Sequence, residues 1–386
     1  FRSKGVRIAV LDTGVDATHP DLKGRIVGAR NFTAAAGTED RVGHGTHVAS
    51  TAAGTGAKSG GRFKGVAPGA EILNGKVLGD DGEGSDSGII AGMEWAAKDV
   101  DAKIVSMSLG SREPSDGTDP MATAVNTLTK DTGALFVVAA GNTGAPSSIG
   151  SPGAADSALT VGAVDSADKA AYFTSQGPRA GDNALKPDLS APGVDILAAR
   201  SQLTSGQGYY TSMSGTSMAT PHIGGVAALL AERHPDWSGQ QLKDALMSTS
   251  HGLDASVYEL GAGRVDVPSA IDAKVTATGG ADFGFYRWPY AENKPVTRKL
   301  TYTNSSSEPV ELTLAARGAA DSVATLADTK LTVPAHGTAS TTVTGDGAKA
   351  PVGATSGAVV DALLGPDGAQ QILERRRIEV GQSCLE

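Results

Sequence analysis

Three side chains that could together activate a hydroxyl group stand at the ends of predicted elements, far apart in the sequence. Asp12 follows the apolar run Val6–Leu11, while His44 and Ser217 each stand at the start of a helical pattern. A serine hydroxyl is a poor nucleophile until a histidine accepts its proton and a carboxylate holds that histidine in one tautomer. The combination predicts a hydrolytic site in which Ser217 attacks a carbonyl carbon, His44 is the general base and Asp12 orients His44.

An attack of this kind also needs hydrogen-bond donors for the oxyanion that forms on the substrate. The backbone N–H of Ser217, at a helix N-terminus, is one predicted donor. The side-chain amide of Asn142, which follows the apolar run Ala134–Ala140, is the second. Removing one such donor typically costs about 3–4 kcal/mol of transition-state stabilisation. The predicted site is complete without a cofactor.

A metal site is an alternative use of the same residues. His44 and His47 are three residues apart on one predicted helix, so both could bind a metal ion with Asp12 as the third ligand. That arrangement gives Asn142 and Ser217 no role, so we expect no metal at this site. The neighbouring polar residues are predicted to be structural, as buried histidines and as the cap of a turn: His47, His222 and Asp16.

Apolar runs alternate with helical patterns before residue 273. Continuous apolar runs are typical of central parallel strands, and their alternation with helices favours an α/β fold with helices on both faces of the sheet. The predicted strands are Val6–Leu11, Ala70–Leu73, Lys103–Leu109, Ala134–Ala140, Ala158–Val164 and Val194–Ala198. The predicted helices are His44–Ala53, Ser85–Lys98, Pro120–Asp131 and Ser217–Arg233.

The pattern changes after Ala273. Short alternating segments rich in threonine, such as Val310-Glu311-Leu312-Thr313-Leu314, are separated by Gly, Pro, Asn and Ser. This pattern predicts strands of a β-sandwich. We therefore expect a catalytic domain over residues 1–273 and a fibronectin-III-like β-sandwich with an accessory role over residues 274–386.

Charge and composition exclude several classes of protein. The 386 residues carry 33 Lys and Arg against 42 Asp and Glu, a net charge of −9, which argues against a nucleic-acid partner. No apolar stretch is long enough to span a membrane. Cys384 is the single cysteine, so an intramolecular disulfide is excluded. We expect a monomeric, secreted, extracellular protein without a membrane contact.

Four short motifs carry a resemblance to a known family. DTGVDATHPDL from Asp12, HGTHVA from His44, AAGN ending at Asn142 and GTSMATPH around Ser217 together resemble the subtilisin family. The order Asp, His, Ser along the chain is also the order in that family. The resemblance extends to the large secreted actinobacterial subtilisin-like proteases with a C-terminal β-sandwich.

The resemblance implies a serine endopeptidase that hydrolyses proteins through an acyl-enzyme intermediate. It implies that two backbone segments hold an extended peptide substrate between them and that Gly150 forms the floor of the pocket for the residue before the cut. These segments are Ser108, Leu109 and Gly110 on one side and Gly82, Glu83 and Gly84 on the other. Protein substrates, and a proteinaceous inhibitor or propeptide, are the implied partners.

An acidic cluster lies in and beside the implied substrate segment Gly82–Gly84. It consists of Asp80, Asp81, Glu83 and Asp86. Carboxylates beside a cleft attract cationic side chains, so the cluster predicts a preference for Lys or Arg two to four residues upstream of the cut. Solvated loop carboxylates without any selectivity are the alternative.

Cation sites of the family are only partly matched. Many subtilisins bind calcium through oxygen ligands in the loop that here spans residues 54–64, which contains no carboxylate or Asn. We therefore do not expect calcium in that loop, although structural calcium elsewhere stays open. Asp188 resembles a ligand of a weaker cation site, but we expect it to be an ordinary surface or capping carboxylate.

Other functions remain open at this level. A tripeptidyl exopeptidase or a peptidyl transferase would use the same triad and would differ only in how the substrate amino end or the incoming nucleophile is handled. A binding protein on a silenced protease fold would be expected to lack a triad member, and none is missing here.

Overall fold

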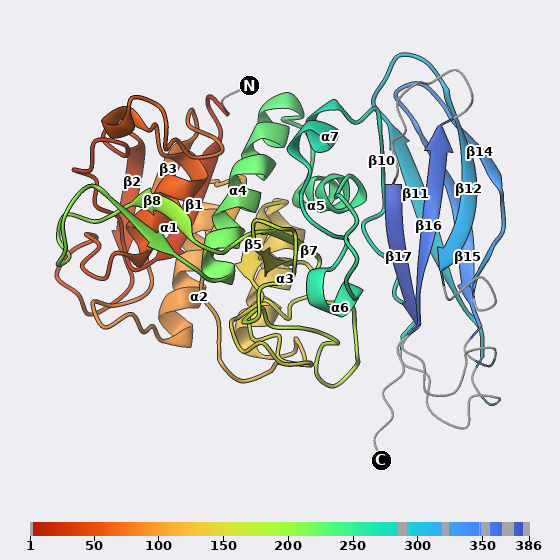
Figure 1. Cartoon of the computed structure of the whole chain (residues 1–386), viewed down its shortest axis with the longest axis horizontal. Coiled ribbons are helices and arrows are strands. Elements are labelled where there is room, and N and C mark those ends of the chain that lie inside the picture. The colour runs from red at the N-terminus through yellow and green to blue at the C-terminus, as the bar shows by residue number, and fades with distance from the viewer. Residues whose placement is uncertain are drawn as a thin grey trace.

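The computed structural model describes residues 3–284, 292, 294–318, 324–346, 348, 356–364 and 374–380. Cys384 lies outside these described residues. The N-terminal part forms an α/β layer structure, and the C-terminal part forms two antiparallel sheets. The two parts lie side by side in Figure 1.

A seven-stranded parallel sheet forms the centre of the N-terminal part, with strand order β2-β3-β1-β4-β5-β6-β7. β1 pairs in parallel with β3 and β4, so the carboxyl ends of the central strands meet at one edge of the sheet. The strands are β1 (Arg7–Asp12), β2 (Ile26–Asn31), β3 (Glu71–Lys76), β4 (Ile104–Met107), β5 (Leu135–Ala139), β6 (Leu159–Val164) and β7 (Leu189–Pro192).

Helices cover both faces of this sheet, as predicted. They are α1 (His44–Ala53), α2 (Asp86–Glu94), α3 (Pro120–Thr132), α4 (Thr216–Arg233), α5 (Gly239–Ser248), α6 (Val257–Leu260) and α7 (Val267–Asp272). Successive side chains of a strand point to opposite faces. Ile8 and Val10 of β1 therefore lie in one core with α1, α4 and α5, whereas Ala9 and Leu11 lie in a second core with α2 and α3.

The structure corrects the predicted strands in two ways. The run Val194–Ala198 is not a strand of the parallel sheet; it overlaps β8 (Ile196–Ala199), which pairs antiparallel with β9 (Tyr210–Met213). β2 and β7 were not predicted. β2 lies at the edge of the sheet and is only partly buried, so it lacks a continuous apolar run, and the short β7 ends in a proline.

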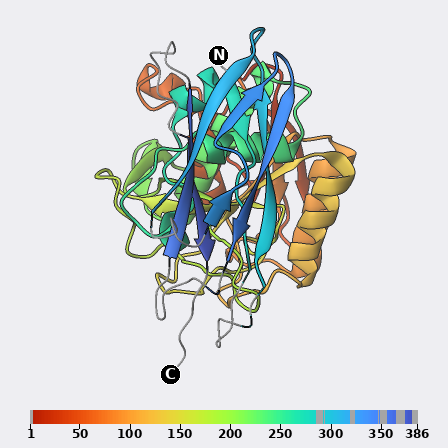
Figure 2. The ribbon, with the colours of Figure 1, turned by 90° about the vertical axis from the view of Figure 1, so that its right-hand side faces the viewer.

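The C-terminal part contains two four-stranded antiparallel sheets, with orders β10-β11-β15-β13 and β14-β12-β16-β17. Their strands are β10 (Val275–Ala277), β11 (Val296–Asn304), β12 (Val310–Gly318), β13 (Ala324–Leu326), β14 (Lys330–Val333), β15 (Thr338–Gly345), β16 (Ser356–Leu364) and β17 (Glu374–Val380). Figure 2 shows these strands in front of the α/β part. Both sheets contribute side chains to a separate core that includes Leu300 and Leu312. The exact domain boundary stays a prediction.

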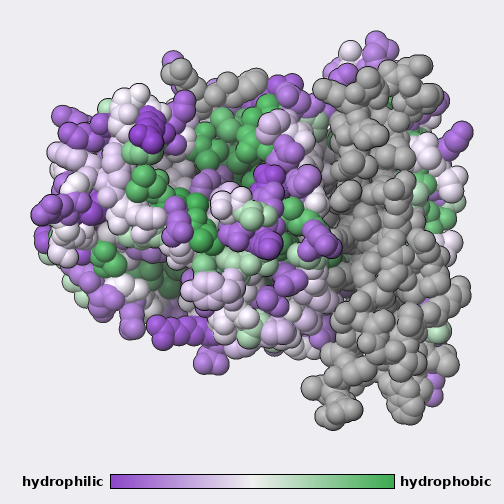
Figure 3. Space-filling model, viewed as in Figure 1, coloured by the Kyte–Doolittle hydropathy of each residue, from purple (hydrophilic) through white to green (hydrophobic). Residues whose placement is uncertain are grey.

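The surface of the α/β part is mixed in character. In Figure 3, hydrophilic residues lie mainly around the periphery of the α/β part, and apolar residues gather over α4. Among the described residues, no helix is long and apolar enough to cross a membrane.

Candidate active site

The end of β1 and the start of α1 bring Asp12 and His44 into contact. His44 Nδ1 donates a hydrogen bond of 2.7 Å to Asp12 Oδ1, which also accepts the N–H of Thr13 at 2.7 Å. Asp12 is 1% exposed. α1 can approach β1 this closely because Gly45 has no side chain; a Cβ there would collide with the carbonyl of Gly14. The hydrogen bond to Asp12 fixes the orientation of the His44 ring, and Nε2 is then the nitrogen that can accept a proton.

A second buried carboxylate, Asp40, supports the same helix start. Asp40 Oδ1 accepts the N–H of Gly43 at 2.7 Å and the hydroxyl of Thr13 at 2.9 Å, and its Oδ2 accepts the N–H of Thr46 at 2.8 Å. An acceptor for these helix N-terminal donors stabilises the start of α1. Asp40 was not predicted from the sequence, although an Asp four residues before His44 matches a helix-start pattern.

The environment of His44 raises its pKa above the ordinary value of 6.5. Burial alone lowers the pKa of this imidazole, but the negative charge of Asp12, the hydrogen bond to Asp12 and the charge of Asp40 together outweigh burial. The imidazolium form is therefore stabilised, as expected of a group that has to hold a proton transiently.

Ser217 lies in the first turn of α4, next to the end of β4. Its hydroxyl donates to the carbonyl of Ser108 at 3.2 Å, and the hydroxyl of Ser108 donates back to the carbonyl of Ser217 at 2.8 Å. The Ser217 hydroxyl therefore has the carbonyl of Ser108 as its acceptor in this structure.

Asn142 follows β5 and contacts the same end of α4. Its Oδ1 accepts both the N–H of Thr216 at 2.9 Å and the hydroxyl of Thr216 at 3.0 Å. These two bonds fix the amide plane and leave the Nδ2 hydrogens as donors. Asn142 is exposed, so its amide NH₂ group is accessible from the solvent.

One groove of about 970 Å³ joins these groups to the predicted substrate segments. His44, Asn142 and Ser217 line it. So do the predicted substrate-binding residues, which are Gly82, Glu83, Gly84, Ser108, Leu109, Gly110 and Gly150. A Cβ at Gly150 would collide with the carbonyl of Ser111, so the glycine is also needed for close backbone packing. The structure brings all of the predicted site residues together, and their roles stay predictions.

The acidic cluster is divided by the structure. Glu83 and Asp86 line the groove. Asp80 is instead paired with Lys76, at 3.0 Å, and Arg41 lies 3.9 Å from it. Asp81 Oδ1 accepts the N–H of Glu83 at 3.0 Å and so stabilises the turn of the loop. Only two of the four predicted carboxylates are therefore placed to meet a substrate.

The polar neighbours of the site are structural, as predicted. Asp16 accepts the N–H of Thr18 at 3.0 Å and the N–H of Gln202 at 2.8 Å. His47 is fully buried, bonds through Nε2 to the carbonyl of Ile196 at 2.9 Å, and has its pKa lowered by burial to about 4. His222 bonds to a backbone carbonyl of its own helix, and burial lowers its pKa.

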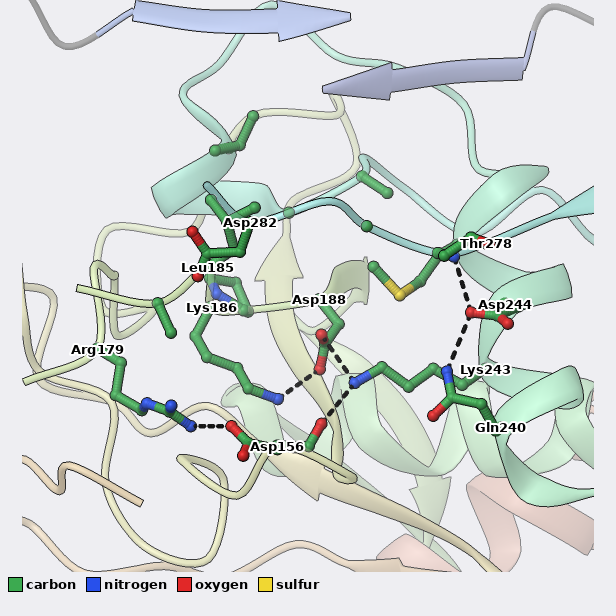
Figure 4. A pocket seen from close by; sticks show the side chains of 18 residues that line it. Asp156, Arg179, Leu185, Lys186, Asp188, Gln240, Lys243, Asp244, Thr278 and Asp282 are labelled. Atoms are coloured by element: carbon green, nitrogen blue, oxygen red, sulfur yellow. Dashed lines mark hydrogen bonds and ion pairs between the residues drawn. The ribbon is translucent and has the colours of Figure 1, made fainter. Parts of the chain in front are cut away.

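Asp188 lies at the floor of a second cavity, of about 260 Å³, between the α/β part and the first residues of the C-terminal part. Figure 4 shows Lys186 and Lys243 reaching Asp188 from two sides. Their Nζ atoms lie 2.8 and 3.0 Å from its carboxylate oxygens, and the N–H of Thr160 donates to it at 2.7 Å. Asp188 is thus a buried ion-pair acceptor, and not the surface or capping carboxylate expected above.

These residues do not fit a bound metal cation. Lys186 and Lys243 occupy both carboxylate oxygens of Asp188, at 2.8 and 3.0 Å, so a cation would have to displace them. Burial lowers the pKa of Lys186 to about 7 despite the charge of Asp188. Asp21, the carboxylate beside the loop 54–64, accepts the N–H of Lys58 at 2.7 Å and the hydroxyl of Tyr210 at 2.8 Å. Both of its oxygens are therefore engaged.

Comparison with known proteins matches this geometry to one family. The sequence model of the Subtilase family matches residues 3–285. The chain is 39% identical over 297 residues to serine protease AprX of Bacillus subtilis (strain 168), covering 69% of this chain. It is 41% identical over 266 residues to Subtilisin BL of Lederbergia lenta, covering 69% of this chain and 90% of that protein. It is also 42% identical over 267 residues to M-protease of Shouchella clausii (strain KSM-K16), again over 69% of this chain.

A solved structure shows the same fold. The crystal structure of a cold adapted subtilisin-like serine proteinase superposes with a TM-score of 0.56 and 33% identity, over 69% of this chain and 88% of that one. The chain spans only 66% of the length of AprX and 64% of that of M-protease.

Proposed function

Because the chain belongs to the subtilase family, we propose that it is a serine endopeptidase that hydrolyses peptide bonds in proteins. The observation that carries the proposal is the shared groove: His44, Ser217 and Asn142 line it together with both backbone segments that the family resemblance assigns to an extended peptide, and Asp12 holds His44 from behind. An exposed peptide backbone binds to such segments by strand-like pairing.

In the proposed mechanism, Ser217 Oγ attacks the carbonyl carbon while His44 Nε2 takes the hydroxyl proton. Asp12 stabilises the imidazolium, and Asn142 Nδ2 and the Ser217 N–H donate to the oxyanion. Collapse of the tetrahedral intermediate breaks the C–N bond as His44 passes its proton to the leaving amine. Water, deprotonated by His44, then attacks the Ser217 ester. Breaking of the bond from the carbonyl carbon to Ser217 Oγ releases the acid product as His44 returns the proton to Oγ.

The test of this function is digestion of an unfolded, disulfide-free protein, with a serine-directed phosphonylating reagent in a parallel sample and all products identified by mass spectrometry. We expect internal fragments, loss of cleavage after labelling, and the label on Ser217. Release of tripeptides alone would replace the endopeptidase with an exopeptidase, and transfer of peptides to an added amine in preference to water would indicate a transferase. A label on another residue would overturn the assignment.

We further propose that Glu83 and Asp86 favour basic side chains upstream of the cut. Asp86 stands at the start of α2, and the groove around it is also lined by the apolar side chains of Ile89, Leu109 and Met121. A long aliphatic side chain with a cationic end suits apolar walls with a carboxylate at the rim. Arg112 also lines the groove, and its neighbour Ser111 donates its N–H to the carbonyl of Ser151, beside Gly150. The positive charge of Arg112 therefore lies near the pocket for the residue before the cut, so the preference for basic side chains is limited to positions further upstream.

This specificity is measurable with peptide libraries. Peptides with Lys or Arg two to four residues before the cut are expected to have a higher kcat/KM than those with Glu. Glu83→Gln and Asp86→Asn are each expected to lower the ratio of kcat/KM for basic peptides to kcat/KM for acidic peptides by about 2–5-fold, the range of an exposed charge pair. Assays in 1 M salt are expected to lower this ratio as well, because salt screens the charges. The matched control is Asp81→Asn, in the same loop but outside the groove. Equal rates for basic and acidic peptides would exclude the preference.

Activity is expected to fall as the pH drops through the pKa of His44. The general base has to be neutral, and the raised pKa moves the acid limb of kcat/KM above that of an ordinary imidazole. Asp40 contributes to this shift. An Asp40→Asn variant is therefore expected to keep more of its maximal rate at low pH, in assays between pH 4 and 9 normalised to folded protein. A rate that is flat down to pH 4 in the parent chain would contradict the role of His44.

We propose that catalysis needs no cofactor and that Asp188 and the loop 54–64 hold no calcium, since the carboxylates there are engaged by lysines and backbone donors. Secretion, a monomeric state and a proteinaceous inhibitor or propeptide as partner stay predictions.

A further inference from the structure

A fully buried lysine stands beside the proposed catalytic pair. Lys76 ends β3, is 0% exposed and lies directly opposite Asp12 in the parallel register of β1 and β3. Its ammonium group donates to the carbonyl of Thr13, lies 3.3 Å from the carbonyl of Glu39, and pairs at 3.0 Å with Asp80 Oδ1. An ammonium group has three donors, and each has an acceptor here.

The three acceptors belong to three different parts of the site. Thr13 follows Asp12 in the chain. Glu39 precedes Asp40, the carboxylate that holds the start of α1 and thus His44. Asp80 belongs to the loop that leads to Gly82, Glu83 and Gly84 in the groove.

We propose that Lys76 is a positioning residue with two roles: it supports the Asp12–His44 pair through the carbonyls of Thr13 and Glu39, and it anchors the substrate loop through its counter-ion Asp80. The inference rests on the proposed function, because it assigns the loop to the binding of substrate. It gives Asp80 a role different from that of Glu83 and Asp86: Asp80 anchors the loop and does not select the substrate.

The remaining bonds of the loop show why this anchor matters. Backbone bonds tie Val77 and Leu78 to the carbonyl of Asp12, at 2.9 and 3.1 Å. Beyond them the loop closes mainly on itself, since the N–H of Gly79 donates to Glu83 at 2.7 Å and that of Gly82 to Gly79 at 3.0 Å. The Lys76–Asp80 pair therefore links an internally closed turn to the buried end of β3.

The two partners are expected to respond differently to substitution. The Asp80 side chain is 43% exposed, so an asparagine amide at this position is hydrated and the Asp80→Asn variant is expected to keep its fold. The loop loses its ion pair with Lys76 in that variant. Lys76 is buried, so Lys76→Met leaves the carbonyls of Thr13 and Glu39 without their donor, next to Asp12 and His44.

The experiment compares two substrates in the full chain. A short chromogenic substrate fills only the pocket before the cut, whereas a long peptide with four upstream residues also reaches the loop. Asp80→Asn is expected to raise KM for the long peptide by about 2–5-fold and to leave both kcat values and the short substrate unchanged. Lys76→Met is expected to lower kcat for both substrates by roughly 10–100-fold through misplacement of the catalytic pair.

Asp81→Asn is the matched control, and circular dichroism with thermal unfolding checks the fold of each variant. If Asp80→Asn and Asp81→Asn give the same KM for the long peptide, Asp80 does not anchor the substrate loop. The anchoring role is also wrong if Asp80→Asn impairs the short substrate equally, because that substrate does not reach the loop. If Lys76→Met fails to fold, the Asp80 comparison still decides. A parent chain that cleaves neither substrate would instead refute the proposed function itself.

Discussion

Ser217→Ala is expected to lower kcat for peptide hydrolysis by about 10⁶-fold, a magnitude known from the same family, with little change in the binding of substrate. The substitution removes the oxygen that forms the acyl-enzyme, while the groove and its backbone segments remain. The measurement is single-turnover cleavage of a labelled peptide, with the Kd of that peptide measured in parallel by fluorescence anisotropy.

The double variant of Ser217→Ala and His44→Ala sharpens this prediction. In the proposed mechanism His44 moves the proton of Ser217, so removal of both side chains is expected to lower kcat hardly more than removal of Ser217 alone. Effects that multiply would show that the two groups work independently. A Ser217→Ala variant that retains more than about one-hundredth of the parent rate would place the nucleophile elsewhere.

Asn142→Leu is expected to lower kcat by about 10²–10³-fold with little change in KM, because the lost Nδ2 donor contacts the oxyanion and not the ground-state carbonyl. That magnitude also comes from this family. The substitution has a second effect, since Asn142 Oδ1 accepts two hydrogen bonds from Thr216. A control therefore has to separate the donor from the acceptor.

Thr216→Val is that control. It removes the hydroxyl that donates to Asn142 at 3.0 Å and keeps the N–H that donates at 2.9 Å. If Asn142 acts through its Nδ2 donor, Thr216→Val lowers kcat far less than Asn142→Leu does. Equal losses would mean that Asn142 serves chiefly to hold the start of α4. Steady-state kinetics on one peptide amide, with separate kcat and KM values, distinguish the two cases.

The positions of the proposed catalytic residues in the fold were predictable because these residues follow strong local signals. Helices α1 and α4 begin within one residue of the predicted positions, His44 and Ser217. The central strands are buried on both faces and therefore read as continuous apolar runs. The segments that line the groove came from the family resemblance and not from residue patterns.

What could not be predicted depends on contacts between distant loops. The sequence shows four neighbouring carboxylates, but only the folded chain shows that Asp80 faces Lys76 while Glu83 and Asp86 face the groove. Likewise, nothing in the sequence around Asp188 indicates that Lys243 of α5 reaches it. Strand β2 was missed because an edge strand has no continuous apolar signal.

The strand order of the central sheet also bears on how the chain reaches its native state. β1 is the first strand in the sequence, yet it lies between β3 and β4, and β2 lies at the edge. Parallel pairings of this kind close long loops before they gain contacts, so the chain is expected to fold slowly. Slowly folding molecules stay unfolded for longer, and with the proposed endopeptidase activity an unfolded chain would be a substrate for neighbours that have already folded. Self-digestion would then compete with folding, and its rate would rise with protein concentration. The yield of intact protein would therefore depend on the rate of folding relative to the rate of cleavage, as well as on stability.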